Sequence, residues 1–368
     1  MKGLILSGGA GTRLRPITHT SAKQLVPVAN KPILFYGIED MVEAGITEIG
    51  IVTGETGPEV RDAVGDGSSF GASVTYIPQD EPLGLAHCVR IARDFLGDDD
   101  FVMYLGDNML QQGLVDFVSV FEKGKAAAAA PTLDGAVPAP AAQILLCPVP
   151  DPQRFGVARV DEQGHVVELI EKPEDPPSDL ALVGVYLFTP AIHEAVASID
   201  PSPRGELEIT DAIQWLIDHG QVVRHDELQG WWLDTGKKDP LLESNRRVLE
   251  ELETRIDGDV DDASVIDGRV VVESGARIVA SHVRGPAIIG AGTLVSDAYI
   301  GPFTAVAEDC RIEHSELDNS VVLARAVISG VPRLVDSLIG RDAHVHRSGQ
   351  RPKATRLMIG DHCSIDLE

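Results

Sequence analysis

Basic residues are scarce in this chain. Its 368 residues include 31 lysines and arginines against 57 aspartates and glutamates, which gives a formal net charge of −26 at pH 7. Nucleic acids and anionic membrane surfaces would be repelled by such a protein. We therefore expect neither nucleic acid nor a membrane among its partners. An anionic substrate would need a local group of cations on this acidic protein.

The sequence also has few cysteines, and neither its cysteines nor its histidines are spaced as metal ligands. The four cysteines, Cys88, Cys147, Cys310 and Cys363, are scattered without metal-ligand spacing, which is typical of reduced thiols in the cytosol. The 11 histidines show no ligand spacing with one another. No apolar run is long enough for a membrane span, and the run after Lys2 is too short for a signal peptide. The sequence predicts a cytoplasmic protein.

Apolar runs and helical patterns alternate through the first half of the chain. The runs are Gly3–Leu6, Ile49–Val52, Val74–Ile77 and Phe101–Leu105, and the helical patterns are Ile33–Ala44, Pro58–Val64 and Leu85–Leu96. This alternation predicts an α/β domain with βαβ units and a Rossmann-like, mostly parallel sheet. Active sites of such sheets lie at the carboxyl ends of the strands. The loop at Gly8 and the carboxylate of Asp107 both fall at such ends.

An Ala/Pro-rich stretch, Lys125–Ala142, interrupts this pattern. We expect the helix of Leu114–Lys123 to stop there and a strand to restart at Gln143, which leaves an exposed insertion of low structural content. Long surface insertions add little closure entropy. The insertion could form a lid or a surface loop, and its bland composition favours the surface loop.

The pattern changes again near Glu253. Apolar residues now recur every six positions, as in Val265 and Val271; Val283, Ile289 and Val295; Ile300, Val306 and Ile312; Ile339 and Val345; Ile359 and Ile365. This period is typical of a left-handed parallel β-helix with inward residues stacked coil on coil, although a β-sandwich could show it by coincidence. We predict a catalytic domain over 1–238, a helical linker over 239–256 and a β-helix over 257–368.

The loop Gly8–Arg15 follows the first apolar run directly. Three glycines within four residues let the backbone approach a phosphate and turn its N–H groups toward it, and Arg13 adds a multi-donor cation. The loop is neither a Walker A sequence nor the usual dinucleotide fingerprint. Taken alone, it indicates either a phosphate site or a plain tight turn.

Six motifs in order extend this signal. They are Gly8–Thr18, Lys23-Gln24-Leu25, Gln79 with Pro82–Ala86, Leu105-Gly106-Asp107-Asn108, Phe155–Val157 with Glu171-Lys172-Pro173, and Arg204–Asp211 with Trp232–Gly236. With them the chain resembles the sugar nucleotidylyltransferases along its whole length, and specifically the long form of the glucose-1-phosphate thymidylyltransferases, which carries an added β-helix. One departure is Phe155, where several relatives have Tyr.

The resemblance implies a site with two substrates. The nucleotide would contact Leu6, Gly8, Gly9, Gly11, Thr12, Arg13, Lys23, Gln24, Gln79, Pro82, Gly84 and Asp107. The sugar phosphate would contact Leu105, Asn108, Gly156, Glu171, Lys172, Val183, Arg204 and Trp232. Catalysis would use Arg13, Lys23, Asp107, Lys172 and Asp234, with Mg²⁺ held by Asp107 and Asp234. Carboxylates are suitable ligands for Mg²⁺, although an aspartate after a strand is often only a turn residue.

The implied reaction joins dTTP and glucose 1-phosphate into dTDP-glucose and pyrophosphate. Gln79 offers both a donor and an acceptor to the imide edge of thymine or uracil, so a UTP-using enzyme stays an alternative. A nucleotide-sugar sensor without turnover is a second alternative. For the β-helix we expect a homo-oligomer contact or a regulatory ligand, ahead of a second, acetyl-transfer activity.

Overall fold

The computed structural model describes residues 1–9, 11, 14–19, 22–129, 138–162 and 164–347. The chain forms two compact units, one of residues 1–10 and 34–232 and the other of residues 11–33 and 233–368. Each unit has its own buried core. The second unit therefore combines a short N-terminal segment with the C-terminal third of the chain. The domain boundaries inferred from the sequence stay a prediction.

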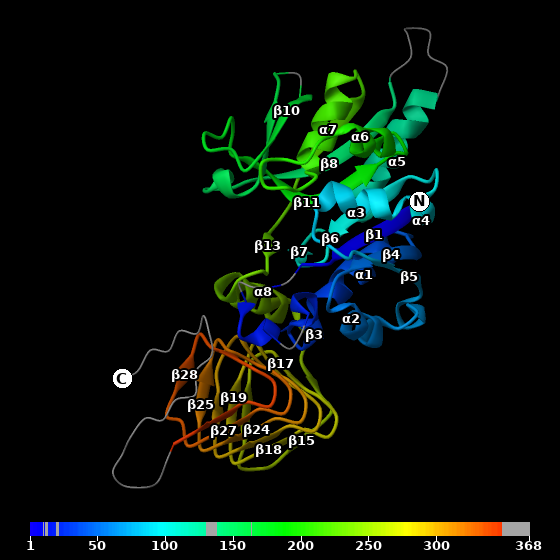
Figure 1. Ribbon diagram of the computed structural model, residues 1–368. Coiled ribbons are helices and arrows are strands. Elements are labelled where there is room, and N and C mark those ends of the chain that lie inside the picture. Colours follow the sequence, from blue (N-terminus) through cyan, green and yellow to red (C-terminus); the bar gives the residue numbers. More distant parts are fainter. Residues whose placement is uncertain (10, 12–13, 20–21, 130–137, 163, 348–368) are drawn as a thin grey trace. The chain divides into compact units, whose positions relative to one another are not determined.

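The first unit is built on a nine-stranded mixed sheet with the order β10-β9-β11-β6-β1-β4-β5, in which β8 pairs with β11 and β12 (Figure 1). The strands are β1 Lys2–Ser7, β4 Glu48–Thr53, β5 Ser73–Pro78, β6 Phe101–Leu105, β8 Pro140–Pro148, β9 Gly156–Val160, β10 Val166–Glu171, β11 Leu180–Phe188 and β12 Val222–Glu227. Strands β6, β1, β4 and β5 are parallel, and β11 joins β6 antiparallel. The expected α/β class and parallel core are confirmed.

Helices connect and cover these strands. They are α1 Ile33–Glu43, α2 Gly57–Val64, α3 Leu85–Ile91, α4 Arg93–Leu96, α5 Val115–Ala129, α6 Ile192–Ser198 and α7 Ile209–Asp218, with 3-10 turns η4 Ser68–Phe70 and η5 Pro152–Arg154. Pro58 lies in the first turn of α2, where its missing N–H costs no bond, and Gly65 ends the helix at φ 66°. The pattern expected as one helix over Leu85–Leu96 divides at Ala92 into α3 and α4.

The expected insertion at Lys125–Ala142 is smaller than its composition indicated. Helix α5 continues through the alanines to Ala129, and β8 begins at Pro140 rather than at Gln143. Alanine is the strongest helix former, so an Ala run extends a helix instead of ending it. Ala141 and Ala142 are buried in β8 at 3% and 0% exposure. The prediction of low structure was wrong at both ends, and residues 130–137 lie outside the described part of the chain.

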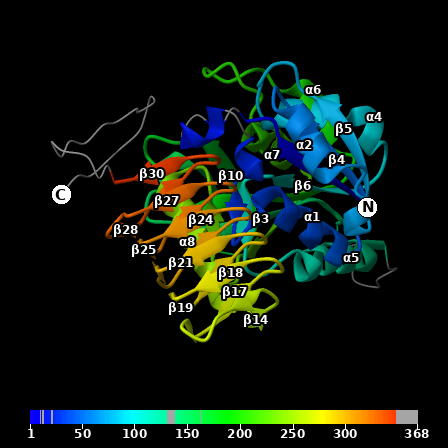
Figure 2. The same ribbon diagram turned by 90° about the horizontal axis from the view of Figure 1, so that it is seen from below.

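The second unit contains a three-sided coil of short parallel strands. The first sheet comprises β14 Arg255–Ile256, β17 Val270–Val272, β20 Ala287–Ile289, β23 Thr304–Val306, β26 Val321–Val322 and β29 Leu338–Ile339. The second comprises β15 Asp259–Val260, β18 Arg277–Val279, β21 Leu294–Ser296, β24 Arg311–Glu313, β27 Val327–Ser329 and β30 His344–His346. The third comprises β16 Val265–Asp267, β19 His282–Arg284, β22 Tyr299–Ile300, β25 Glu316–Asp318 and β28 Leu334–Val335. Figure 2 shows the coils stacked in chain order, and the left-handed β-helix is confirmed.

The register of this β-helix differs from a strict six-residue period. Val283 pairs with Ile300 and Ile289 with Val306, so one coil takes 17 residues. The paired strands elsewhere lie 16 to 18 residues apart, so some steps differ from six residues. Counting back in sixes from Val283 therefore reaches the wrong side chains. Val265 is 49% exposed and Val271 lies outside the central core, whereas Ile266 packs against that core and Val272 lies within it. The inward placement expected for Val265 and Val271 was wrong.

The other inward positions that lie in the described residues are confirmed. Val283, Ile289, Val295, Ile300, Val306 and Ile312 are completely buried in the central core of the β-helix, and Ile339 and Val345 pack partly buried against it. Ile359 and Ile365 lie outside the described residues. Stacked β-branched side chains of this kind fill the narrow coil interior without gaps.

Outside its coils, the second unit contains helix α8 (Lys238–Glu251), the hairpin strands β2 (Pro27–Val28) and β3 (Lys31–Pro32), and the 3-10 turns η2 (Ile17–His19) and η3 (Lys23–Leu25). Strand β7 (Asn108–Leu110) belongs to the first unit, and β13 (Trp232–Asp234) contains the boundary between the units. Within the described residues, no helix has the length and apolar character needed to cross a bilayer.

The register can be tested with a matched pair of isoleucines. Ile300 is fully buried in the β-helix core, and Ile256 in β14 is 42% exposed. We expect Ile300→Ala to lower the free energy of unfolding by about 2–5 kcal/mol because it leaves a cavity. Ile256→Ala should change it by less than about 0.5 kcal/mol. Urea unfolding followed by circular dichroism measures both, and equal losses would contradict the assigned register.

Candidate functional site

Three strand ends of the first unit meet at Gly8. Ser7, the fully buried last residue of β1, precedes it. A Cβ on Gly8 would lie 2.9 Å from Gln79 Oε1, beyond the end of β5, and a Cβ on Gly54, beyond β4, would lie 2.8 Å from the Gly8 carbonyl oxygen. A side chain at Gly54 would meet backbone, and one at Gly8 would displace the amide of Gln79. The glycine-rich loop therefore begins where the carboxyl ends of β1, β4 and β5 converge, as expected for a phosphate-binding loop.

The side-chain amide of Gln79 is oriented by two residues for which the sequence predicted no role. Its Nε2 lies 3.0 Å from His87 Nδ1 and donates to Cys88 Sγ at 3.3 Å. Burial, followed by the nearby charge of Arg90, lowers the pKa of His87, so its ring is neutral and Nδ1 can accept. Burial raises the pKa of the Cys88 thiol to about 12, which keeps it protonated and unreactive. His87 and Cys88 thus fix the direction in which Gln79 Oε1 points.

The segment at Pro82–Ala86 is held against the chain before α7. Gly84 has a φ of 103°, and a Cβ there would lie 2.4 Å from the Leu207 carbonyl oxygen. Leu207 N donates to Leu83 O at 2.8 Å, and Ala86 N donates to Leu207 O at 3.0 Å. These two backbone bonds leave no room for a side chain at Gly84. The loop that carries Gln79, Pro82 and Gly84 is therefore fixed on both sides.

The end of β6 places Leu105, Asp107 and Asn108 beside a bulge in β11. The register of β11 against β8 shifts between Leu182 and Tyr186, and the Asn108 side chain donates through Nδ2 to the Val183 carbonyl in this bulge. Asn108 is 3% exposed. Its amide therefore links β7 to β11 and orients the turn that contains Asp107, and the structure brings Asn108 and Val183 together.

Tyr104 lies behind this turn. Its hydroxyl donates to Asn108 O at 3.3 Å and lies 3.5 Å from Asp40 Oδ2 of α1. Burial raises the pKa of Tyr104, and the charges of Asp40 and Asp107 raise it further. The phenol consequently stays protonated and can donate to the turn that holds Asp107. Asp107 itself takes part in interactions within the chain.

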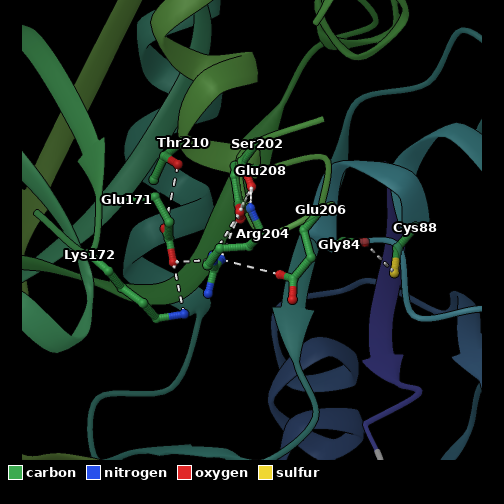
Figure 3. A network of polar contacts seen from close by, with 9 residues as sticks. All are labelled: Gly84, Cys88, Glu171, Lys172, Ser202, Arg204, Glu206, Glu208 and Thr210. Atoms are coloured by element: carbon green, nitrogen blue, oxygen red, sulfur yellow. Dashed lines mark hydrogen bonds and ion pairs between the residues drawn. The ribbon is translucent and has the colours of Figure 1, made fainter. Parts of the chain in front are cut away.

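Glu171, Lys172 and Arg204 form one polar network in the first unit (Figure 3). Glu171 Oε1 lies 3.2 Å from Lys172 Nζ and 3.5 Å from Arg204 Nη2, and its Oε2 accepts from the Thr210 hydroxyl at 3.4 Å. A Cβ on Gly156 would lie 3.0 Å from Glu171 Oε2. The structure therefore brings together four of the residues expected to bind the sugar phosphate.

Arg204 is anchored by the carboxylate of Glu208, for which the sequence predicted no role of its own. Glu208 Oε1 accepts from Arg204 Nη2 at 2.7 Å, from Arg204 Nε at 3.2 Å and from the Ser202 hydroxyl at 2.8 Å. Its side chain is only 5% exposed, whereas Glu206, 3.2 Å from Arg204 Nη2, is 40% exposed. Burial raises the pKa of Asp211, and the charges of Glu208 and Glu171 raise it further. Carboxylates thus surround the cations in this network.

The cations of the network are still accessible. The side chains of Lys172 and Arg204 are 45% and 39% exposed. The backbone N–H of Lys172 donates to Phe155 O at 3.0 Å, and the Phe155 ring packs edge-on against Trp232 at 5.3 Å. Among the described residues, the buried indole N–H of Trp232 has no hydrogen-bond partner. Two cations, a carboxylate and an indole are the groups that a phosphorylated sugar would use.

Leu6 in β1 and Gly9 belong to the first unit, and the remaining predicted site residues belong to the second. A Cβ on Gly11 would lie 3.0 Å from Lys23 Cβ, and the Thr18 hydroxyl donates to Gly11 O at 2.6 Å. Gln24 is 1% exposed, and its Oε1 has no hydrogen-bond partner in the part of the chain that the structure describes. Asp234 Oδ1 accepts from Gly236 N at 3.0 Å. Thr12 and Arg13 lie outside the described residues.

A parallel sheet with a glycine loop after its first strand and an aspartate after β6 defines a nucleotide-binding α/β enzyme. Residues 2–251 match the family described as Nucleotidyl transferase, and the chain belongs to this family.

Two relatives match the whole chain. A glucose-1-phosphate thymidylyltransferase of Streptomyces antibioticus is 56% identical over 100% of both chains, and one of Streptomyces griseus is 57% identical over 100% of this chain and 99% of its own. A Bacillus anthracis crystal structure, assigned as a glucose-1-phosphate thymidylyltransferase, is 35% identical with a TM-score of 0.61. It covers 69% of this chain and 97% of its own.

Two glycines test the clamp at Leu207. Gly84 and Gly97 both have positive φ, at 103° and 59°, but a Cβ on Gly97 would meet nothing within 4 Å. Gly97→Ala should lower the free energy of unfolding by about 1–2 kcal/mol through backbone strain alone. Gly84→Ala should lower it further because the Leu207 backbone must move. Urea denaturation measures the difference, and a Gly84→Ala variant as stable as Gly97→Ala would refute the clamp.

Proposed function

We propose that this protein transfers dTMP from dTTP to α-D-glucose 1-phosphate, giving dTDP-glucose and pyrophosphate. The proposal rests on sequence identities of 56% and 57% with two glucose-1-phosphate thymidylyltransferases over the whole chain. The network of Glu171, Lys172 and Arg204 supports it, because it offers exposed cations beside a carboxylate that can accept from sugar hydroxyls.

The reaction is an in-line attack of the sugar phosphate oxygen on the α-phosphorus of dTTP. A phosphate monoester has a second pKa near ~6, so the nucleophile is already ionised at neutral pH and needs no general base. The obstacle is repulsion between two polyanions, since one unit-charge pair at about 4 Å contributes roughly 4 kcal/mol at an effective dielectric near 20. Lys172 and Arg204 would offset the charge of the sugar phosphate. Arg13 and Lys23 would offset the charge of the triphosphate.

Asp107 and Asp234 are the residues that would hold Mg²⁺. Among the described residues there is no group of three or more His, Cys, Asp or Glu side chains placed to hold a metal. Magnesium at nucleotide sites commonly uses one or two carboxylates and completes its shell with substrate phosphates and water, so the predicted pair fits its chemistry. When bound, the ion would neutralise phosphate charge. The bond from the Asn108 side chain to Val183 O fixes the turn beside Asp107 and supports this proposal.

The proposed function is tested by pyrophosphate release with dTTP, UTP and ATP, each paired with glucose 1-phosphate or galactose 1-phosphate. We expect the highest kcat/KM for dTTP with glucose 1-phosphate. A single methyl group distinguishes thymine from uracil and contributes about 1–3 kcal/mol of discrimination, so UTP should be a weaker substrate. Asp107→Asn should lower kcat by about 100-fold or more. Binding of dTTP without any release of pyrophosphate would indicate a sensor instead.

The anchoring of Arg204 gives a second kinetic test. Glu208→Gln removes the buried charge that orients the guanidinium, and we expect the KM for glucose 1-phosphate to rise about tenfold with the KM for dTTP unchanged.

Glu206→Gln is the matched control, because it removes the same charge from an exposed partner of Arg204. It should leave both KM values within about twofold. A fall in the KM for glucose 1-phosphate with both variants would show that the carboxylates only repel the substrate and do not position Arg204.

Two expectations concern the whole protein. A homo-oligomer through the β-helix would use the outer faces of its coils, and a cytoplasmic location would fit the pattern of scattered cysteines. Both stay predictions, which mass measurement in solution and cell fractionation can test.

A further inference from the structure

The second unit joins its N-terminal segment, Gly11–Ile33, to the β-helix. We call this segment the arm. Its last part is the hairpin β2–β3, whose turn residues Ala29 and Asn30 both have positive φ, at 47° and 62°. Left-handed conformations at both central residues are typical of a tight hairpin turn that follows the twist of its strands. The turn is therefore a defined structure.

Two asparagine side chains fix this turn. Asn245 of α8 is completely buried, and its Oδ1 accepts from Ala29 N at 2.9 Å while its Nδ2 donates to Phe303 O at 2.9 Å. Asn30 donates through Nδ2 to Val306 O of strand β23 at 2.8 Å. Asn245 uses both ends of its amide, so it bridges the arm and the coil that carries Phe303.

An apolar contact surrounds these polar bonds. Ala29 packs in one buried cluster with Leu249 of α8 and with Val271, Ile288 and Ala305 of the β-helix. These three β-helix residues belong to successive strands of one sheet, β17, β20 and β23. The hairpin and α8 therefore cover one outer face of the solenoid, and a mobile attachment would expose that face to water.

The other end of the arm carries the residues predicted to bind the triphosphate. Lys23 and Gln24 lie in η3, and Val26 follows with 2% exposure. Val26 N donates to Lys23 O at 3.2 Å, and Ile33 N donates to Val26 O at 3.2 Å. The bond between Ile33 and Val26 extends the pairing of β2 with β3, and the bond between Val26 and Lys23 joins η3 to it, so the position of η3 depends on that of the hairpin.

We infer that Asn30 and Asn245 are positioning residues that hold the arm on the β-helix so that Lys23 and Gln24 meet the triphosphate of dTTP. The inference rests on the proposed function and assigns the β-helix a part in nucleotide binding. Loosening the hairpin should weaken dTTP binding while glucose 1-phosphate binding stays unchanged, because the sugar-phosphate network of Glu171, Lys172 and Arg204 belongs to the first unit.

Asn30→Gly is the sharpest test. Glycine keeps the φ of 62° without strain and removes only the bond to Val306 O. We expect the KM for dTTP to rise about three- to tenfold, as for the loss of one hydrogen bond, with the KM for glucose 1-phosphate unchanged and the unfolding midpoint lowered no more than in the control variant Asn319→Gly. The Kd for dTTP, measured by calorimetry, should rise by the same factor.

Asn319→Gly is the matched control. Asn319 also has a positive φ, at 39°, and its Nδ2 donates to Asp336 Oδ1 at 2.6 Å within the β-helix. It should leave both KM values unchanged. Asn245→Ala removes two bonds and should raise the KM for dTTP further, with its unfolding midpoint measured in parallel.

The outcomes separate the inference from the proposed function. If the wild-type enzyme makes dTDP-glucose and Asn30→Gly does not change dTTP binding, the inference is wrong and the proposed function stands. Equal changes in both KM values, or equal effects of Asn30→Gly and Asn319→Gly, would also overturn the inference. If the wild-type protein releases no pyrophosphate, the proposed function fails, and the calorimetric Kd of the same variants still decides the role of Asn30.

Discussion

The close approach of backbones at the ends of β1, β4 and β5 is the constraint on which the first unit depends. The Gly8 carbonyl lies so close to Gly54 that Gly54 does not accept a Cβ, and a Cβ on Gly8 would displace the side-chain amide of Gln79. Parallel strands make this possible, because their carboxyl ends point the same way. A glycine-rich loop at such a convergence is a suitable place for a phosphate. The remaining residues of the first unit are arranged around this fixed point.

The small number of cations on this acidic chain is a second constraint on the site. A chain with a net charge of −26 has few cations to offer, and an arginine on it is attracted by many carboxylates. The buried carboxylate of Glu208 fixes Arg204 in one position. It accepts from two nitrogens of the guanidinium and leaves part of that group exposed. Glu171 adds a contact to both Arg204 and Lys172. Anchored cations lose less side-chain entropy when an anion binds, so a few of them can serve a doubly charged phosphate.

Strands, helices and motifs with a clear local pattern could be predicted from the sequence. Strand register and side-chain contacts, which depend on packing, could not. The strand at Phe101–Leu105 and the helix near Ile33–Glu43 follow from local pattern. The six-residue count failed at Val265 and Val271 because the coils are 16 to 18 residues long rather than a constant 18, which no local rule reveals. His87, Cys88 and Glu208 contact the motif residues Gln79 and Arg204, but these contacts depend on side-chain packing, so only the fold shows them. The roles of Arg13, Lys23 and Asp234 stay predictions.

The contacts that attach the β-helix to the rest of its unit are separate from the contacts that fill its own core. Its inward stack, from Val272 to Ile328, is complete without outside contacts. Val271, Ile288 and Ala305 instead point outward on one sheet, and they are buried only because Ala29 and α8 cover them. Apolar residues on an otherwise polar outer face indicate a fixed partner. Within the described residues that partner is the hairpin of the arm together with α8. Removing the coils would uncover Ala29 and Leu249 and leave Asn245 without Phe303 O. The β-helix is therefore part of the structural support of the arm.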